Sequence, residues 1–226
     1  MDRDLHVVIG ASGATGSVIV RELHRAGRRV RAVNRSGRMS LPDGVEVAGA
    51  DATDPAQMRE VCAGAAVVYN CVNPPFLQWR ETFPAAVDGI LAGAVAAEAT
   101  LVYADNTWMY GRVTAPMTEN TPYRPVSNLG VLRAWLADRI LAAHQRGDVR
   151  AVIGRAGELF GPRVESTIRP RRVRRRTAQP NRALAWCTGS VAYAAVHRRL
   201  RARPDHVGRR GRKHSDRYGI SRTRTR

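Results

Sequence analysis

Apolar residues in the first part of the chain follow two alternating patterns. Short runs rich in β-branched residues predict buried strands over residues 5–9, 29–33, 45–48, 66–72, 100–104 and 150–153. Apolar residues at helical spacing predict helices over residues 14–25, 55–64, 84–97 and 129–144. Single helices between successive strands return the chain to the same edge of a sheet, so most strands must be parallel. The pattern therefore predicts an α/β fold with a doubly wound parallel sheet.

A glycine-rich turn lies between the first predicted strand and the first predicted helix. Glycine permits a tight turn and a close approach of the backbone to a pyrophosphate, and the helix N-terminus adds free N–H groups. Because the turn opens a strand–helix–strand unit, it predicts dinucleotide binding rather than a merely structural turn. The residues concerned are the run Gly10-Ala11-Ser12-Gly13-Ala14-Thr15-Gly16.

The G-x-x-G-x-x-G spacing resembles the short-chain dehydrogenase/reductase superfamily and, within it, the NAD(P)-dependent epimerase/dehydratase branch. Later segments agree in order: 49–52, 101–111, 116–122 and 155–162. The resemblance covers about residues 5–163 and implies an NAD(P)-binding Rossmann domain over 1–163. It also implies that Asp51 contacts the adenine, with Ala52 in the same cofactor-binding loop, and that Cys71 lies near the nicotinamide. The implied substrate is a small carbonyl compound or sugar-nucleotide-like molecule. A small buried thiol is the alternative role for Cys71.

The end of the second predicted strand bears on the choice of cofactor. Enzymes that use NAD usually carry an acid there, which binds the ribose hydroxyl groups. This chain has Asn34 and Arg35 instead, followed by Arg38. An arginine can pair with a 2′-phosphate, whereas an acid would repel it. The sequence therefore favours NADP(H) over NAD(H), the alternative being that both arginines are ordinary solvated charges.

The usual catalytic pair of short-chain reductases, Tyr-x-x-x-Lys, is missing. Lys213 is the only lysine and no tyrosine precedes it at that spacing; the resemblance places the pair at Gly130 and Ala134. Asp105, Asn106 and Tyr110 follow the fifth predicted strand and are the candidate catalytic residues. Asp105 could act as a general base if burial raised its pKa. Alternatively, Asp105 and Asn106 cap the strand end and Tyr110 packs.

Net charge divides the chain into two parts. The whole chain carries +18, but residues 1–162 hold 17 basic and 16 acidic residues, whereas residues 163–226 hold 20 basic and three acidic ones. Poor periodicity and few apolar residues predict a mostly disordered tail over 164–226. A shifted reading frame or a truncated gene model in a GC-rich gene is the favoured explanation of this composition. A basic arm for nucleic acid is a less favoured reading, and an anionic membrane surface finds no apolar helical face to support it.

Three function hypotheses result: an NADP-binding epimerase- or reductase-like enzyme, a catalytically silent NADP-binding sensor, and nucleic-acid binding by the tail. The three cysteines and six histidines show no metal-ligand spacing, so no metal site is expected. No apolar run is long enough to cross a bilayer, and a cytoplasmic location is the expectation. Relatives often dimerise through the helix that corresponds to 129–144, which makes a homodimer a candidate assembly.

Overall fold

Six parallel strands form the centre of the molecule in a computed structural model that describes residues 4–157 and 159. All neighbouring strands pair in parallel, in the order β3-β2-β1-β4-β5-β6. The predicted doubly wound α/β fold is therefore confirmed. The strands are β1 (Leu5–Ile9), β2 (Arg29–Asn34), β3 (Glu46–Gly49), β4 (Ala65–Asn70), β5 (Thr100–Asp105) and β6 (Arg150–Arg155).

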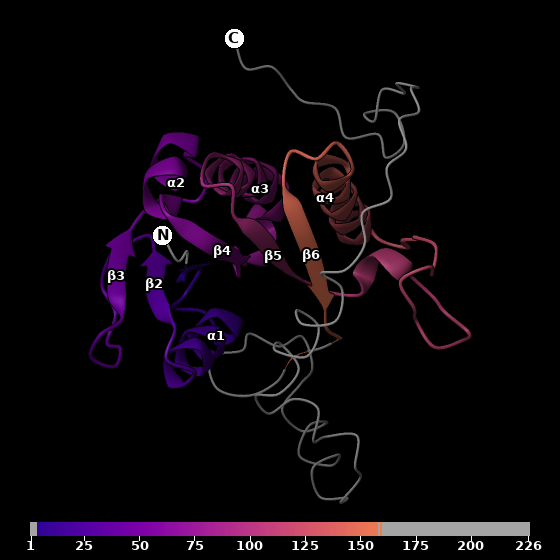
Figure 1. Ribbon diagram of the computed structural model, residues 1–226. Coiled ribbons are helices and arrows are strands. Elements are labelled where there is room, and N and C mark those ends of the chain that lie inside the picture. The colour runs from indigo at the N-terminus through magenta and orange to yellow at the C-terminus, as the bar shows by residue number, and fades with distance from the viewer. Residues whose placement is uncertain (1–3, 158, 160–226) are drawn as a thin grey trace, which may run out of the picture.

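The helices cover the two faces of the sheet unequally. Helix α1 (Ala14–Arg25) lies on one face, and α2 (Pro55–Cys62), α3 (Trp79–Ala96) and α4 (Asn128–Gln145) lie on the other (Figure 1). The larger apolar core lies under α2, α3 and α4, and a smaller one joins α1 to β1, β2 and β4. Two 3₁₀ turns, Phe76–Gln78 and Trp108–Tyr110, follow β4 and β5. Both turns therefore lie in connections that leave the carboxyl ends of the strands.

Several predicted boundaries differ from those in the structure by one or two residues, and the start of α3 differs most. Helix α3 begins at Trp79 rather than at Pro84, because Trp79 and Phe83 are only 2% and 1% exposed and their burial holds the turn before the proline. Strand β4 ends at Asn70 rather than at residue 72. The Asn70 side chain accepts a hydrogen bond from the backbone N–H of Val72 at 3.1 Å, which turns the chain out of the strand.

Candidate functional site

A cleft of about 540 Å³ opens at the carboxyl ends of the central strands. It lies where β1 and β4 are neighbours, and the connection after β1 leads to α1 on one face while that after β4 leads to α3 on the other (Figure 1). A change of direction between adjacent connections leaves a crevice above the strand ends. The cleft thus lies where the fold class places a ligand.

The glycine turn forms one wall of this cleft by backbone approach. Gly10 has φ +82°, and a Cβ there would lie 2.7 Å from the carbonyl oxygen of Cys71. A Cβ on Gly16 would lie 2.3 Å from the carbonyl oxygen of Gly10. No side chain caps the N-terminus of α1, and Ala14 and Thr15 of its first turn line the cleft. Uncapped N–H groups beside a turn whose backbone packs too closely to admit side chains at Gly10 and Gly16 suit a phosphate group.

The structure brings most of the predicted cofactor residues to the cleft. Ala11 and Gly16 are the exceptions, because Ala11 is fully buried in the core beside α1 and Gly16 packs against the turn. Both serve the shape of the turn and do not line the cleft. The predicted residues that line it are Gly10, Ser12, Gly13, Ala14, Thr15, Asn34, Arg35, Asp51, Ala52 and Cys71.

The side chains at the β2–β3 end of the cleft differ in how many hydrogen bonds and ion pairs they already form within the protein. Asn34 accepts a hydrogen bond from the N–H of Gly37 at 2.7 Å and so closes the turn after β2. Hydrogen bonds from the N–H and hydroxyl of Thr53 lower the pKa of Asp51, which therefore stays ionised. Arg35 is exposed, lines the cleft and forms no ion pair with the residues that the structure describes. Its guanidinium is thus available to a ligand.

Cys71 lies between the glycine turn and the other end of the cleft. Burial raises the pKa of its thiol to about 12, so the thiol stays protonated near neutral pH. A protonated thiol is a poor nucleophile. The structure favours the small buried role over a reactive one.

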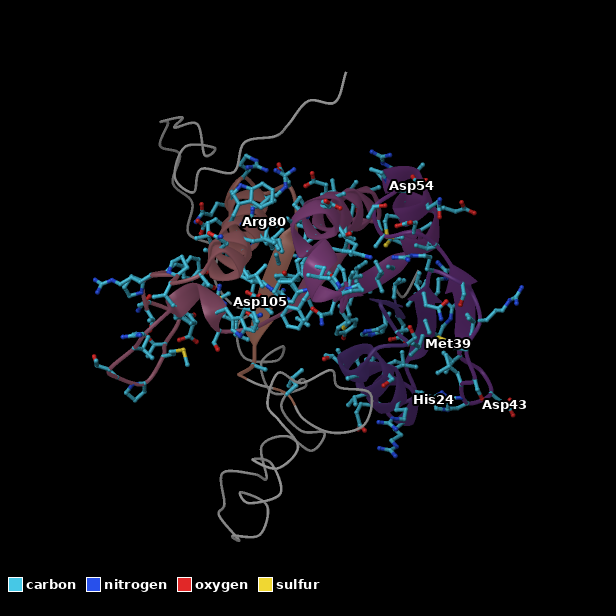
Figure 2. The ribbon with its side chains drawn as sticks, turned by 180° about the vertical axis from the view of Figure 1, so that it is seen from behind. His24, Met39, Asp43, Asp54, Arg80 and Asp105 are labelled. Carbon is cyan, nitrogen blue, oxygen red and sulfur yellow. The ribbon has the colours of Figure 1, made fainter. Side chains whose placement is uncertain are left out.

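Asp105 lies at the end of β5 between two arginines. Its carboxylate oxygens lie 3.4 Å from Nη1 of Arg133 on α4 and 3.4 Å from Nε of Arg155 on β6. The Asp105 side chain has no exposed surface, and Figure 2 shows it near the middle of the molecule, whereas His24 and Asp43 lie at the outer edge. Burial raises the pKa of Asp105, and the two guanidinium groups oppose that shift. An enclosed, paired carboxylate is a poor general base, because no substrate proton can reach it without rearrangement.

Asn106 and Tyr110 have separate positions. Asn106 lines the cleft, and its side-chain oxygen accepts a hydrogen bond from the N–H of Trp108 at 3.0 Å. Tyr110 does not line the cleft: it is 4% exposed, and its hydroxyl accepts a hydrogen bond from Arg155. The structure therefore supports the capping and packing roles for these residues and does not bring Tyr110 to the candidate site.

The positions that the resemblance assigns to the tyrosine–lysine pair are filled by packing. A Cβ on Gly130 would lie 2.7 Å from the carbonyl oxygen of Trp108, so a tyrosine cannot occupy that position without moving the chain. Ala134 is fully buried against Met109 and Tyr110. The packing around these two positions thus leaves no room for the tyrosine–lysine pair that the sequence lacks.

Sequence reasoning missed the most heavily buried cation of the cleft, Arg133. It is 5% exposed, lines the cleft, and donates hydrogen bonds to Tyr103 at 3.0 Å and to Asn73 at 3.3 Å. Its Cζ lies 4.3 Å from the ring centroids of both Trp79 and Phe83. Trp79 and Phe83 are visible in the sequence as aromatic residues that could line a cleft or anchor the following helix, but no local pattern pairs them with Arg133.

Comparison with protein families settles the relationship that the glycine turn suggests. A model described as the NAD dependent epimerase/dehydratase family matches residues 6–197. The chain belongs to the NAD dependent epimerase/dehydratase family. The matched range continues past residue 163, where the motifs predict its end, and into the arginine-rich segment. The predicted tail over 164–226, its reading frame and its nucleic-acid binding lie outside the described residues.

Solved structures of similar fold include two proteins whose descriptions name UDP-sugars and one sugar-acid dehydrogenase. MoeE5 in complex with UDP-glucose and NAD is 27% identical, with a TM-score of 0.57 over 70% of this chain and 55% of that one. A UDP-galactose 4-epimerase is 23% identical, with a TM-score of 0.63 over 78% and 64% of the two chains. Glucuronic acid dehydrogenase from Chromohalobacter salexigens is 18% identical, with a TM-score of 0.61 over 70% and 62%. This chain thus spans 55% to 64% of these structures. No curated protein matches the chain.

The described residues include neither a helix that could span a membrane nor a cluster that could hold a metal ion. No helix among them is long and apolar enough to cross a membrane. Within the same residues, no group of three or more histidine, cysteine or acidic side chains could hold a metal ion.

Proposed function

We propose that this family member binds NADP(H) in the cleft and acts on a small carbonyl or sugar-nucleotide-like substrate. The observation that carries the proposal is the backbone cradle of Gly10 and Gly16 at the uncapped N-terminus of α1. The pyrophosphate would lie on the first turn of α1, where N–H groups and the positive end of the helix dipole favour negative charge. Asp51 and Ala52 would then lie beside the adenosine.

The preference for NADP(H) rests on Arg35. It lines the same end of the cleft as Asn34, whose amide is already used in closing the turn, and no acid stands at the end of β2. A guanidinium can bind a 2′-phosphate with two charge-assisted hydrogen bonds, whereas a ribose hydroxyl is uncharged and offers only one oxygen. MoeE5 was solved in complex with NAD, so the preference distinguishes this chain from that relative.

The test is a fluorescence titration of the full chain with NADPH and with NADH. Wild type should bind NADPH about 10-fold or more tightly, and Arg35→Ser should remove most of that difference, as expected for a lost charge-assisted contact of about 1.4 kcal/mol or more. Arg38→Ser is the matched control, because Arg38 lies in the same turn but does not line the cleft. Equal affinity of wild type for the two cofactors would overturn the preference, and no saturable binding of either would overturn the proposed function.

At the substrate end, a bound nicotinamide would supply or accept a hydride. Asn106 lines the cleft there, and the free N–H groups of its amide can donate a hydrogen bond to a carbonyl oxygen of the substrate. Trp79 and Trp108 line the same end and give it an aromatic surface. With Gly130 and Ala134 at the positions of the usual pair, proton transfer would have to use solvent or another group.

The filled tyrosine and lysine positions also favour a second candidate, an NADP-binding sensor without turnover. Gly130 cannot carry a larger side chain, and Ala134 has no exposed surface. A panel of carbonyl compounds incubated with the full chain and NADPH distinguishes the two candidates. Turnover that falls in Asn106→Ala would exclude the sensor, whereas saturable NADPH binding without turnover of any compound would support it.

A further inference from the structure

Arg133 is held in a fixed orientation at the substrate end of the cleft. The rings of Trp79 and Phe83 pack against its guanidinium, with Cζ 4.3 Å from each ring centroid. The side chain is 5% exposed, yet it lines the cleft. A guanidinium fixed by aromatic rings loses little further entropy on binding a ligand, so its free donors are preorganised.

The donors of Arg133 are unequally used. Nη1 donates to the hydroxyl of Tyr103 at 3.0 Å and lies 3.4 Å from Asp105. Nη2 donates to the side-chain oxygen of Asn73 at 3.3 Å, which leaves its second hydrogen free. Nε is buried and has no hydrogen-bond partner in the described part of the chain. The edge formed by Nε and Nη2 therefore has one acceptor, the Asn73 oxygen on Nη2, and none on Nε.

That edge has the geometry of a carboxylate site. Nε–H and one Nη2–H point in the same direction, and two parallel hydrogen bonds from them match the two oxygens of a carboxylate. A buried donor without a partner costs about 1–3 kcal/mol, which an incoming acceptor would relieve. Asn73 is exposed and offers only its one amide oxygen to this edge, so a carboxylate that binds both Nε and Nη2 would displace it.

The charges around Arg133 favour a monoanion. Asp105 contributes one negative charge, and Arg133 and Arg155 contribute two positive ones. A carboxylate would balance the remaining positive charge. A phosphate dianion would leave an excess negative charge beside the buried Asp105, which is unfavourable at low dielectric constant.

The neighbouring surface suits an apolar, planar body. Phe76 stacks on Trp79 and on Trp108, with ring centroids 4.7 and 5.7 Å apart, and all three residues line the cleft. We call Phe76, Trp79 and Trp108 the aromatic shelf. We propose that Arg133 binds the carboxylate of a small carbonyl substrate whose apolar or planar body rests on the aromatic shelf. This assignment rests on the proposed function, whose substrate class it narrows.

The test uses tryptophan fluorescence of the full chain titrated with benzoate, benzamide and phenyl phosphate, because Trp79 and Trp108 belong to the shelf. These probes share one ring and differ in the group that meets Arg133. Benzoate should bind about 10-fold or more tightly than benzamide, and more tightly than phenyl phosphate. Equal binding of benzoate and benzamide, or tighter binding of phenyl phosphate, would overturn the proposal.

Variants separate binding from folding. Arg133→Met should reduce benzoate affinity to that for benzamide, and Arg133→Lys should regain only part of it, because lysine lacks the paired donors. Asn73→Ala removes the internal acceptor of an exposed residue and should tighten benzoate binding severalfold. Arg146→Met, at the C-terminal cap of the same helix, should leave benzoate affinity unchanged.

Each sample is also titrated with NADPH. Normal NADPH binding by Arg133→Met would show that the fold persists. Its lower affinity for benzoate would then reflect the lost guanidinium and not unfolding. If Arg133→Met does not fold, the Asn73→Ala variant tests the proposal instead. Unchanged or weaker binding of benzoate by that variant would contradict a carboxylate site at Nε and Nη2 of Arg133. A wild type that binds benzoate through Arg133 but not NADPH would refute the proposed function alone. One that binds NADPH without preferring benzoate would refute only this inference.

Discussion

Backbone atoms form one end of the cleft, and side chains from distant elements form the other. At the dinucleotide end, Gly10, Gly16 and the first turn of α1 act through backbone atoms and lie within one short segment. At the substrate end, Asp105 and Arg133 act through side chains from β5 and α4, far apart in sequence. The first end depends on local conformation, whereas the second depends on how distant elements pack. A function made by local backbone is visible in a sequence, and one made by packed side chains is not.

The ends also differ in how they handle charge. Arg35 is exposed and forms no ion pair among the described residues, so solvent already stabilises it. Asp105 has no exposed surface and depends on its two arginines. A change at the dinucleotide end should therefore lower stability less than a change at the substrate end, where a buried charge would lose its partner. Three experiments test this contrast.

The largest effect should come from Asp105→Asn. The amide keeps the size of the side chain but leaves the guanidinium groups of Arg133 and Arg155 without a counter-charge in a buried place, which costs about 3–5 kcal/mol. Urea unfolding at pH 7 measures the free energy of unfolding. Asp148→Asn is the control, because its 2.7 Å ion pair with Arg146 is exposed and contributes at most about 1 kcal/mol. Equal losses in the two variants would show that the buried cluster is not important for stability.

A smaller loss of stability, with loss of binding, should follow from Gly16→Ala. The new methyl group would lie 2.3 Å from the carbonyl oxygen of Gly10 and would push the turn away from α1, at a cost of about 1–3 kcal/mol. NADPH affinity should fall by more than 10-fold, as measured by fluorescence titration. Gly27→Ala, which follows the same helix, meets nothing within 4 Å but lies at φ +70°, so it should lower stability through backbone strain and leave NADPH affinity unchanged. Retained affinity in Gly16→Ala would refute the backbone cradle.

The smallest effect concerns Cys71, which lies between the two ends. Burial raises the pKa of its thiol from 9.0 to about 12. Between these values the unfolded chain loses the thiol proton while the folded protein keeps it, so stability is complete below pH 9 and falls as the pH rises. From pH 8 to pH 10 the free energy of unfolding should fall by about 1 kcal/mol less in Cys71→Ala than in wild type. Identical pH slopes would mean that the thiol is accessible to solvent.

Much of the fold and half of the site could be predicted from residue order. The parallel sheet followed from alternating strand and helix patterns, and the glycine turn located the cleft. The start of α3 could not be predicted, because the burial of Trp79 and Phe83 overrides the usual meaning of Pro84. Tyr110 was expected near the chemistry because it follows β5, but its hydroxyl pairs with Arg155 outside the cleft.

The sequence by itself determined the fold class, the family and the dinucleotide end, because each depends on backbone conformation within a few neighbouring residues. Only the tertiary structure decided that Asp105 is enclosed, that the carbonyl group of Trp108 fills the space a side chain at Gly130 would need, and that Arg133 faces the cleft. These outcomes depend on which side chains meet across β5, β6, α3 and α4. These contacts form between residues far apart in the sequence, so no local sequence pattern predicts them.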